Sequence, residues 1–261
     1  LEAVRRHADR IDLFCQAGEI RLPPKYQPIL TQLEDSIHPV SAPQGGIFHP
    51  KVWAIRFADL ESGAFRHRLL CMSRNLTFDR SWDVILQLEE EAAAQRGGPT
   101  EDLARFVEAL PPMAVTPMSE DRVELIRQMA DGLRRAGFSL PERCREMRFH
   151  PLGLDEGRSR LRIRGQNRVA VVSPFLSDSA LQDLGRGARE ALLVSRQEAL
   201  DALNPETQRA YKDKFTLDPA ASVTEGVDSA GTSEHGARGT LSGLHAKLFV
   251  TEHDQDASVF V

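Results

Sequence analysis

FHPKVW, at residues 48–53, has a close counterpart in LHAKLF, at residues 244–249, so the pattern His-x-Lys occurs once in each half of the chain. The chain has 8 histidines and few lysines, and chance would produce roughly 0.15 such tripeptides at this composition. A short pattern can still arise by accident in exposed strands. Whether the two motifs indicate a function therefore depends on the residues around them.

The residues around each motif alternate between polar and apolar, which predicts that both motifs lie in β-strands. Residues i and i+2 of a strand point to one face, so His49 would lie beside Lys51, and His245 beside Lys247. The apolar neighbours of the second motif, at positions 244 to 250, would take the buried face. An imidazole beside an ammonium group suits a phosphate, because lysine neutralises oxygens while histidine attacks phosphorus or protonates a leaving oxygen.

The composition is that of an ordinary globular protein, with 261 residues of which 41% are hydrophobic and 27% charged. A net charge of −5 excludes a surface that is basic throughout, although a local basic groove can still hold a phosphate backbone. No apolar run is long enough to cross a bilayer, so we expect no membrane partner. Three widely spaced cysteines suit a reducing interior, and we expect a cytoplasmic location.

The N-terminal region, from residue 11 to residue 88, is rich in predicted strands. IDLFCQ, KVWAIRF, HRLLCM and WDVILQL have strand patterns, and residues 58–64 predict a hairpin turn. The region from 90 to 150 predicts two helices instead. One is expected to stop at Pro111-Pro112, and the other to begin after an N-cap at Ser119.

From residue 161 onwards, predicted strands and helices alternate. RVAVVSPF and REALLVS have strand patterns, and a capping box from Ser195 to Glu198 predicts the start of a helix. LHAKLFV and ASVFV are expected to close the chain as two strands. We interpret the two strand-rich regions as an internal duplication, with one half at 1–90, a helical spacer at 91–159 and a second half at 160–261.

The stretch MSRNLTFDRSWD, at residues 72–83, follows the first motif by one predicted strand. Here the chain resembles the phospholipase D superfamily, in which each half carries His-x-Lys and then Gly-Ser-x-Asn. Ser73 and Asn75 match the Ser and the Asn, with Met72 in place of the Gly. SPFLS and LLVSR, at 173–177 and 192–196, resemble the strands that lead into the family's second half. The resemblance covers about residues 11 to 89 and 160 to 261.

The sequence departs from the family in its acidic residues. The usual Asp, five residues after the Lys, is replaced by Arg56 in the first half and by Glu252 in the second. Some nuclease-like members use an acid after the Asn instead, and Asp83 is our candidate, although a surface carboxylate at a strand end is an equal alternative. Aligning SVFV with RLLCM places the second Ser-x-Asn past Val261, so we expect the second half to be incomplete.

The resemblance implies an α/β fold of two α-β-α sandwich halves with mixed sheets, related by a pseudo-two-fold axis. It implies that His49 and His245 act on one phosphate, one as the nucleophile of a phosphohistidine intermediate and the other as the acid and base. Either histidine suits either role, and we take His49 as the first choice of nucleophile. Lys51, Lys247 and Asn75 would hold the phosphate oxygens.

The supporting residues implied by the family are Ser73 and an acid, Asp83 or Glu252, that orients the opposite imidazole. No cofactor is required, and we find no spacing of His, Asp and Glu that predicts a metal site.

Contacts to a nucleic acid are predicted with less specificity. Trp53 and Trp82 flank the site in sequence and could stack on a base, but we favour a core-packing role for both. Arg162, Arg164 and Arg168 alternate on a predicted strand and could follow a phosphate backbone, or they could protect an exposed strand edge. The remaining histidines, including His38 and His67, are expected at the surface or in loops.

The leading function is a metal-independent phosphodiesterase that cleaves nucleic acid, with DNA as the first choice. The nuclease-like bacterial members that the chain resembles occur in restriction and phage-defence settings, which implies a helicase or ATPase partner. The alternatives are a phospholipase or phosphatidyltransferase, and a weakened module that binds nucleic acid without cleaving it. The oligomeric state is left open.

Overall fold

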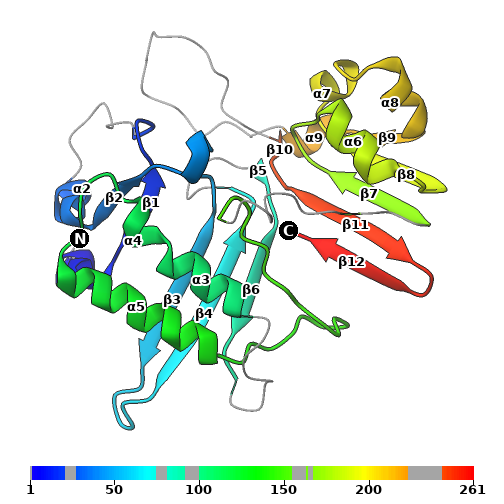
Figure 1. Cartoon of the computed structure of the whole chain (residues 1–261). Helices are drawn as coiled ribbons and strands as arrows, with labels where there is room; N and C mark the ends of the chain where they lie inside the picture. The colour runs from blue at the N-terminus through cyan, green and yellow to red at the C-terminus, as the bar shows by residue number, and fades with distance from the viewer. Residues whose placement is uncertain are drawn as a thin grey trace. The chain divides into compact units, whose positions relative to one another are not determined.

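The structure is a computed structural model that describes residues 2–20, 28–74, 81–91, 100–154, 163, 167–222 and 243–261. It is a mixed α/β protein with several sheets (Figure 1). The chain divides into two compact units. The first unit contains Leu1–Pro50, Ala54–Leu69 and Leu88–Leu161, and the second contains Lys51–Trp53, Leu70–Gln87 and Arg162–Val261.

The first unit begins with a small parallel sheet flanked by short helices. Strand β1 pairs with β2 along their whole length, from Leu13 opposite Ile37 to Gln16 opposite Val40. The strand predicted from IDLFCQ is therefore present. The elements of this region are α1 (Glu2–His7), η1 (Ala8–Arg10), β1 (Leu13–Gln16), α2 (Pro28–Gln32), η2 (Glu34–Ser36), β2 (Ile37–Val40) and η3 (Pro43–Gly45).

A three-stranded sheet follows, in the order β3-β4-β6, from β3 (Val52–Ala58), β4 (Phe65–Met72) and β6 (Ile85–Glu89). The predicted turn joins β3 to β4: the amide of Asp59 donates to the carbonyl of Ala64 at 2.8 Å. The carboxylate of Asp59 accepts from the amides of the two residues at 61 and 62. Gly63 takes φ = 68°, which a residue without Cβ adopts freely.

The helical region forms α3 (Glu101–Glu108), α4 (Leu110–Met113) and α5 (Glu120–Arg135). The prediction that Pro111-Pro112 ends the helix is wrong in part. The longer helix already ends at Glu108, and the prolines lie in the first turn of a new short helix, where a missing N–H costs nothing. Ser119 precedes α5 with extended backbone, but its side chain makes no capping hydrogen bond.

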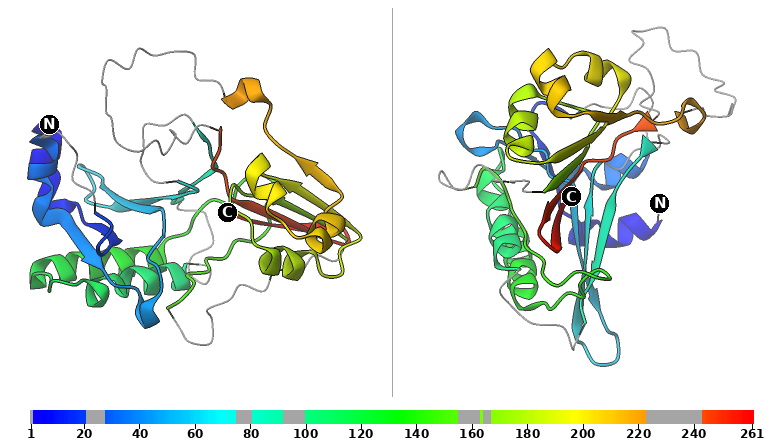
Figure 2. Two further views of the ribbon diagram at one scale, coloured as in Figure 1. Left: turned by 90° about the horizontal axis from the view of Figure 1, so that it is seen from above. Right: turned by 90° about the vertical axis from the view of Figure 1, so that its right-hand side faces the viewer.

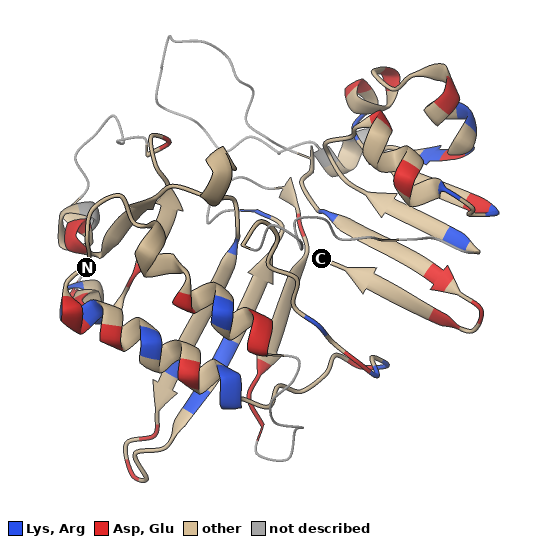
Figure 3. Cartoon of the chain, viewed as in Figure 1, with Lys and Arg blue, Asp and Glu red and all other residues tan. Residues whose placement is uncertain are grey.

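Helices α3 and α5 lie side by side in the first unit (Figures 1 and 2). Ile126, Ala130 and Leu133 are buried on α5 at helical spacing, as are Leu103 and Val107 on α3. Acidic and basic residues occupy the remaining face of α5 (Figure 3), with Glu120 and Asp121 in its first turn and Arg134 and Arg135 in its last. This distribution of charge favours the helix dipole.

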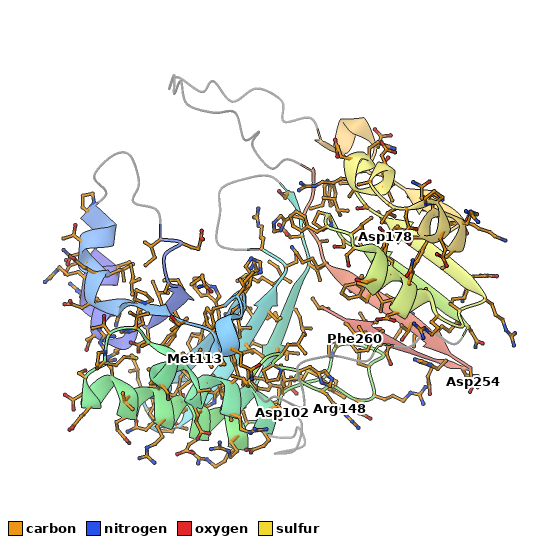
Figure 4. All side chains as sticks on the ribbon, turned by 45° about the horizontal axis from the view of Figure 1, so that its top comes forward. Asp102, Met113, Arg148, Asp178, Asp254 and Phe260 are labelled. Carbon is orange, nitrogen blue, oxygen red and sulfur yellow. The ribbon has the colours of Figure 1, made fainter. Side chains whose placement is uncertain are left out.

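A five-stranded mixed sheet forms the centre of the second unit, in the order β12-β11-β7-β8-β9. Strands β7, β8 and β9 are parallel, whereas β11 is antiparallel to both β7 and β12. Asp254, with φ = 49°, marks the tip of the β11–β12 hairpin, and Phe260 ends its second strand (Figure 4). The bounds are β7 (Arg168–Val172), β8 (Glu190–Val194), β9 (Asp213–Phe215), β11 (Leu248–His253) and β12 (Asp256–Phe260).

Helices of this unit pack on the sheet through one apolar cluster, which includes Val171, Leu181, Leu193 and Tyr211. The cluster takes residues from α6 (Asp178–Gly185) and α7 (Gln197–Asp201). The other helices of the unit are α8 (Pro205–Ala210) and α9 (Pro219–Ser222). The capping box predicted at the start of α7 is absent. The Ser195 hydroxyl donates to the carbonyl of Ser173 at 2.6 Å instead, so it ties two strand ends together.

Two short strands complete the second unit. Strand β5 (Ser81–Trp82) pairs in parallel with β10 (Gly243–Leu244), which places residues 81–83 beside residues 243–245. The predicted division into a first half, a spacer and a second half stays a prediction.

Candidate active site

The second His-x-Lys motif lies just before a strand and not within it. His245 and Lys247 occupy the short link between β10 and β11. The amides of His245 and Ala246 both donate to the carbonyl of Trp82, at 2.9 and 2.8 Å, so the link bonds to β5 and not to a continued β11 ladder. Lys51 likewise precedes β3. The prediction that the motifs lie inside strands is therefore wrong, although Leu244 and Ala246 are buried as expected.

Asp83 holds the imidazole of His245. Its Oδ1 lies 3.2 Å from Nδ1 of the ring and accepts a hydrogen bond of 2.9 Å from the Ser73 hydroxyl. Its Oδ2 forms an ion pair with Nε of Arg74 at 2.7 Å. The side chain of Asp83 is only 9% exposed. A carboxylate fixed in this way sets the orientation of the ring, favours the tautomer with its proton on Nδ1, and directs chemistry to Nε2.

Ser73 connects the acid to the lysine. Its hydroxyl contacts Asp83, and its carbonyl accepts a hydrogen bond of 2.9 Å from Nζ of Lys247. The same Nζ also donates to the carbonyl of His245 at 3.2 Å. Ser73 is buried and exchanges two hydrogen bonds with Val84, one from its amide and one to its hydroxyl. One rigid residue therefore positions both partners of the motif.

Two lysine amines share a poorly solvated region. Burial and the neighbouring charge of Lys247 lower the pKa of Lys51 to about 8. Burial also lowers the pKa of Lys247, and the charge of Arg196 lowers it further, while Asp83 partly offsets the shift. Cations held this close destabilise one another, and an anion bound beside them would relieve that repulsion. The electrostatics of this region therefore favour an anionic ligand.

Sequence reasoning missed two residues of this region, Phe175 and Arg196. Both Nε and Nη2 of Arg196 donate to the carbonyl of Leu244, at 3.1 and 2.9 Å, which fixes the backbone directly before His245. The ring centroid of Phe175 lies 5.6 Å from Nζ of Lys247 and 5.8 Å from Cζ of Arg196. The sequence offered a signal for both residues, since Phe175 ends the predicted strand RVAVVSPF and Arg196 directly follows the predicted strand REALLVS.

Glu252 does not lie against His245. It is on β11 and forms an ion pair with Arg168, in which Nη2 donates to Oε1 at 3.0 Å. The guanidinium lowers the pKa of Glu252, and the carboxylate raises the pKa of Arg168. Asp83 is thus the acid that contacts the imidazole of His245, and an orienting role for Glu252 at His49 stays a prediction. A role for Arg168 in binding nucleic acid stays a prediction.

Other predicted residues belong to the first unit or lie outside the described part of the chain. His49 is an exposed residue of the first unit, three residues before β3, and its sharing of one phosphate with His245 stays a prediction. Asn75, Arg162 and Arg164 lie outside the described residues.

The core-packing role that we favoured for the two tryptophans is wrong. Trp53 is 41% exposed and Trp82 is 58% exposed. The indole N–H of Trp82 donates to the carbonyl of Ala221 at 3.2 Å, and its own carbonyl receives the two amides of the motif. The ring of Trp82 therefore stands at the surface of the second unit, while its backbone supports the site.

Two histidines that we expected at the surface are buried in the first unit. His38 contacts Asp12, with Nε2 and Oδ1 2.8 Å apart, and the Nδ1 atom of His67 lies 2.7 Å from Oε2 of Glu90. The carboxylate in each pair offsets the cost of removing an imidazole from water. The sequence could not show these pairs because each joins residues more than twenty positions apart.

Comparisons of the chain with protein-family models, with curated proteins and with solved structures each found no match. In the described part of the chain, no helix has both the length and the apolar character that crossing a membrane requires. Among those same residues, no group of three His, Cys, Asp or Glu side chains is arranged to hold a metal ion. A function for this protein must therefore come from the chemistry of its side chains.

Proposed function

We propose that the protein is a metal-independent phosphodiesterase of the phospholipase D superfamily that cleaves nucleic acid, with DNA as its first substrate. In this proposal, residues 1–90 and 160–261 are duplicated halves related by a pseudo-two-fold axis. The observation that carries the proposal is the contact between Asp83 and His245 next to Lys247. It joins the family's His-x-Lys motif to an acid that follows the Ser-x-Asn motif of the other half.

The arrangement fits phosphoryl transfer better than a structural role for the histidine. A histidine that served only in packing would gain little from two nearby lysines whose positive charges repel one another. A bound phosphodiester would supply a negative charge that offsets the repulsion between Lys51 and Lys247. The negative charge on its oxygens increases in the transition state, so the two lysines would stabilise that state most. Asp83 supports the positive charge that the His245 ring acquires during the reaction.

The proposed reaction has two steps and needs two histidines. Nε2 of one histidine attacks phosphorus and forms a P–N bond, while the P–O bond to the leaving group breaks and the second histidine protonates that oxygen. The second histidine then removes a proton from water, which attacks phosphorus and breaks the P–N bond. His245 is suited to either role, with His49 as its partner.

Cleavage in EDTA tests this proposal. Labelled single- and double-stranded DNA and bis(p-nitrophenyl) phosphate would be offered to wild type, His49→Ala and His245→Ala. We expect wild type to cleave in EDTA and each variant to lose at least roughly 100-fold in kcat, because general acid–base catalysis contributes on that scale or more. Asp83→Asn should lose activity in the same assay while keeping the fold.

His253→Ala is the matched control, because this histidine lies on β11 in the same unit and contacts Thr251. It should retain the activity of wild type. Full activity in the His245→Ala variant would refute the proposal. Binding of DNA without cleavage by wild type would favour the binding-module alternative, and cleavage of a phospholipid alone would favour the lipid-active one.

A further inference from the structure

The second unit places an exposed aromatic ring next to the lysine of the proposed site. Phe175 is 62% exposed. Single exposed apolar residues are common, and exposure alone indicates nothing. What distinguishes Phe175 is its position, since its ring centroid is 5.6 Å from Nζ of Lys247. A phosphate held by that amine would therefore have the ring as its neighbour.

The topology of the sheet explains why these residues meet. Strands β7 and β8 are parallel, so the residues that follow them, including Phe175 and Arg196, leave the sheet at the same edge. Strand β11 runs antiparallel to β7, so its first residues, directly after Lys247, lie at that edge too. Ligands of open sheets bind at the carboxyl ends of parallel strands.

Phe175 is held firmly in its exposed position. The Ser173 hydroxyl donates to the carbonyl of Phe175 at 2.7 Å and accepts from its amide at 3.2 Å. Ser173 is itself buried, and its carbonyl accepts the hydroxyl of Ser195 at the end of β8. The loop is thus fastened to two strands, so that a ligand would not need to order it, which lowers the entropic cost of binding.

We propose that Phe175 is a specificity residue whose ring stacks on a base next to the phosphate held by Lys247, so that the site prefers an unpaired strand. This inference rests on the proposed function, because the phosphate it adjoins is the one to be cleaved. Every base has a flat face that can stack on an aromatic ring, whereas the bases of a duplex are already stacked on one another. A lipid headgroup offers no such face.

The test measures binding, so that it does not depend on cleavage. His245→Ala protein would be titrated with a fluorescent single-stranded oligothymidylate and with an abasic oligonucleotide of equal length, and anisotropy would give both affinities. We expect the strand with bases to bind more tightly. Adding Phe175→Ala should weaken binding of the oligothymidylate by roughly 5- to 150-fold and remove most of the preference for it over the abasic strand. Phe175→Trp in place of Phe175→Ala should restore that preference.

Phe215→Ala is the matched control, because Phe215 is also an exposed aromatic residue, at 52%, and lies on β9 in the same unit. It should leave the preference for bases intact. The inference would be overturned by equal affinity of the His245→Ala protein for the two oligonucleotides, or by a Phe175→Ala change that weakens both to the same extent. A wild-type protein that prefers bases through Phe175 but cleaves nothing would refute the proposed cleavage, whereas the stacking of a base on Phe175 would be confirmed.

Discussion

Asp83 and Glu252 show how the surroundings of a carboxylate decide its use. Glu252 lies five residues after Lys247, and Asp83 follows the Ser-x-Asn motif of the first half. Each carboxylate forms an ion pair with an arginine. The side chain of Glu252 on β11 is 31% exposed, and its charge is balanced by Arg168. Asp83 is buried at the end of β5 and turns one oxygen to His245. A carboxylate that is shielded from water interacts more strongly with a nearby ring.

The lowered pKa of Lys51 predicts how activity depends on pH. With a pKa of about 8, the amine is charged below that pH and loses its charge above it. Binding of an anionic substrate should weaken accordingly, and kcat/KM, which reports on the free enzyme, should fall as the pH rises through about 8.

Lys51→Arg is the control for this pH dependence, since a guanidinium stays charged throughout the range. The variant should have a lower overall rate, but its fall in kcat/KM should move to higher pH. A profile for wild type that is flat up to pH 10, or an identical fall in Lys51→Arg, would show that the charge of Lys51 is not what limits binding.

At the scale of elements, periodicity predicts most helices and strands but not the positions of the motifs. Helix α5 and strands β3, β4, β7 and β8 lie where the apolar patterns place them, whereas β11 begins four residues later than predicted. The His-x-Lys segment has the same alternation, yet its amides bond to Trp82 on another strand. A local sequence pattern cannot indicate such a partner, because Trp82 lies more than 160 residues away in sequence.

Gly132 lies where helix α5 closely approaches the side chain of His67 on strand β4. A Cβ atom at this position would lie 2.5 Å from Nε2 of His67 and 2.7 Å from its Cε1. The ring cannot easily move, because Glu90 holds its Nδ1 and also the amide of His67. Gly132→Ala should therefore destabilise the protein by about 1–3 kcal/mol, although alanine favours a helix by about 1 kcal/mol.

Urea denaturation of Gly132→Ala and of the same change in a His67→Ala background checks this prediction. Removing the ring should make the alanine neutral or stabilising. If Gly132→Ala stabilises the protein while His67 is present, then α5 does not approach the ring as closely as described.

At the scale of the whole molecule, the sequence offers the candidate residues but not their grouping. The contact between Asp83 and His245 joins positions 162 residues apart and forms because β5 pairs with β10. Phe175 and Arg196 gain their significance only from a sheet that brings three chain segments to one edge. These are properties of the folded chain, whereas the two His-x-Lys motifs can be read from the sequence directly.

The central claim is that His245 takes part in covalent phosphoryl transfer, and trapping the intermediate tests it most directly. Wild type would be mixed in EDTA with DNA carrying a radioactive scissile phosphate and quenched in alkaline detergent, in which a phosphohistidine survives. We predict label on the wild-type protein, and its loss in His245→Ala or in His49→Ala, according to which histidine is the nucleophile. Cleavage with no labelled protein, or label that persists in both variants, would contradict the account.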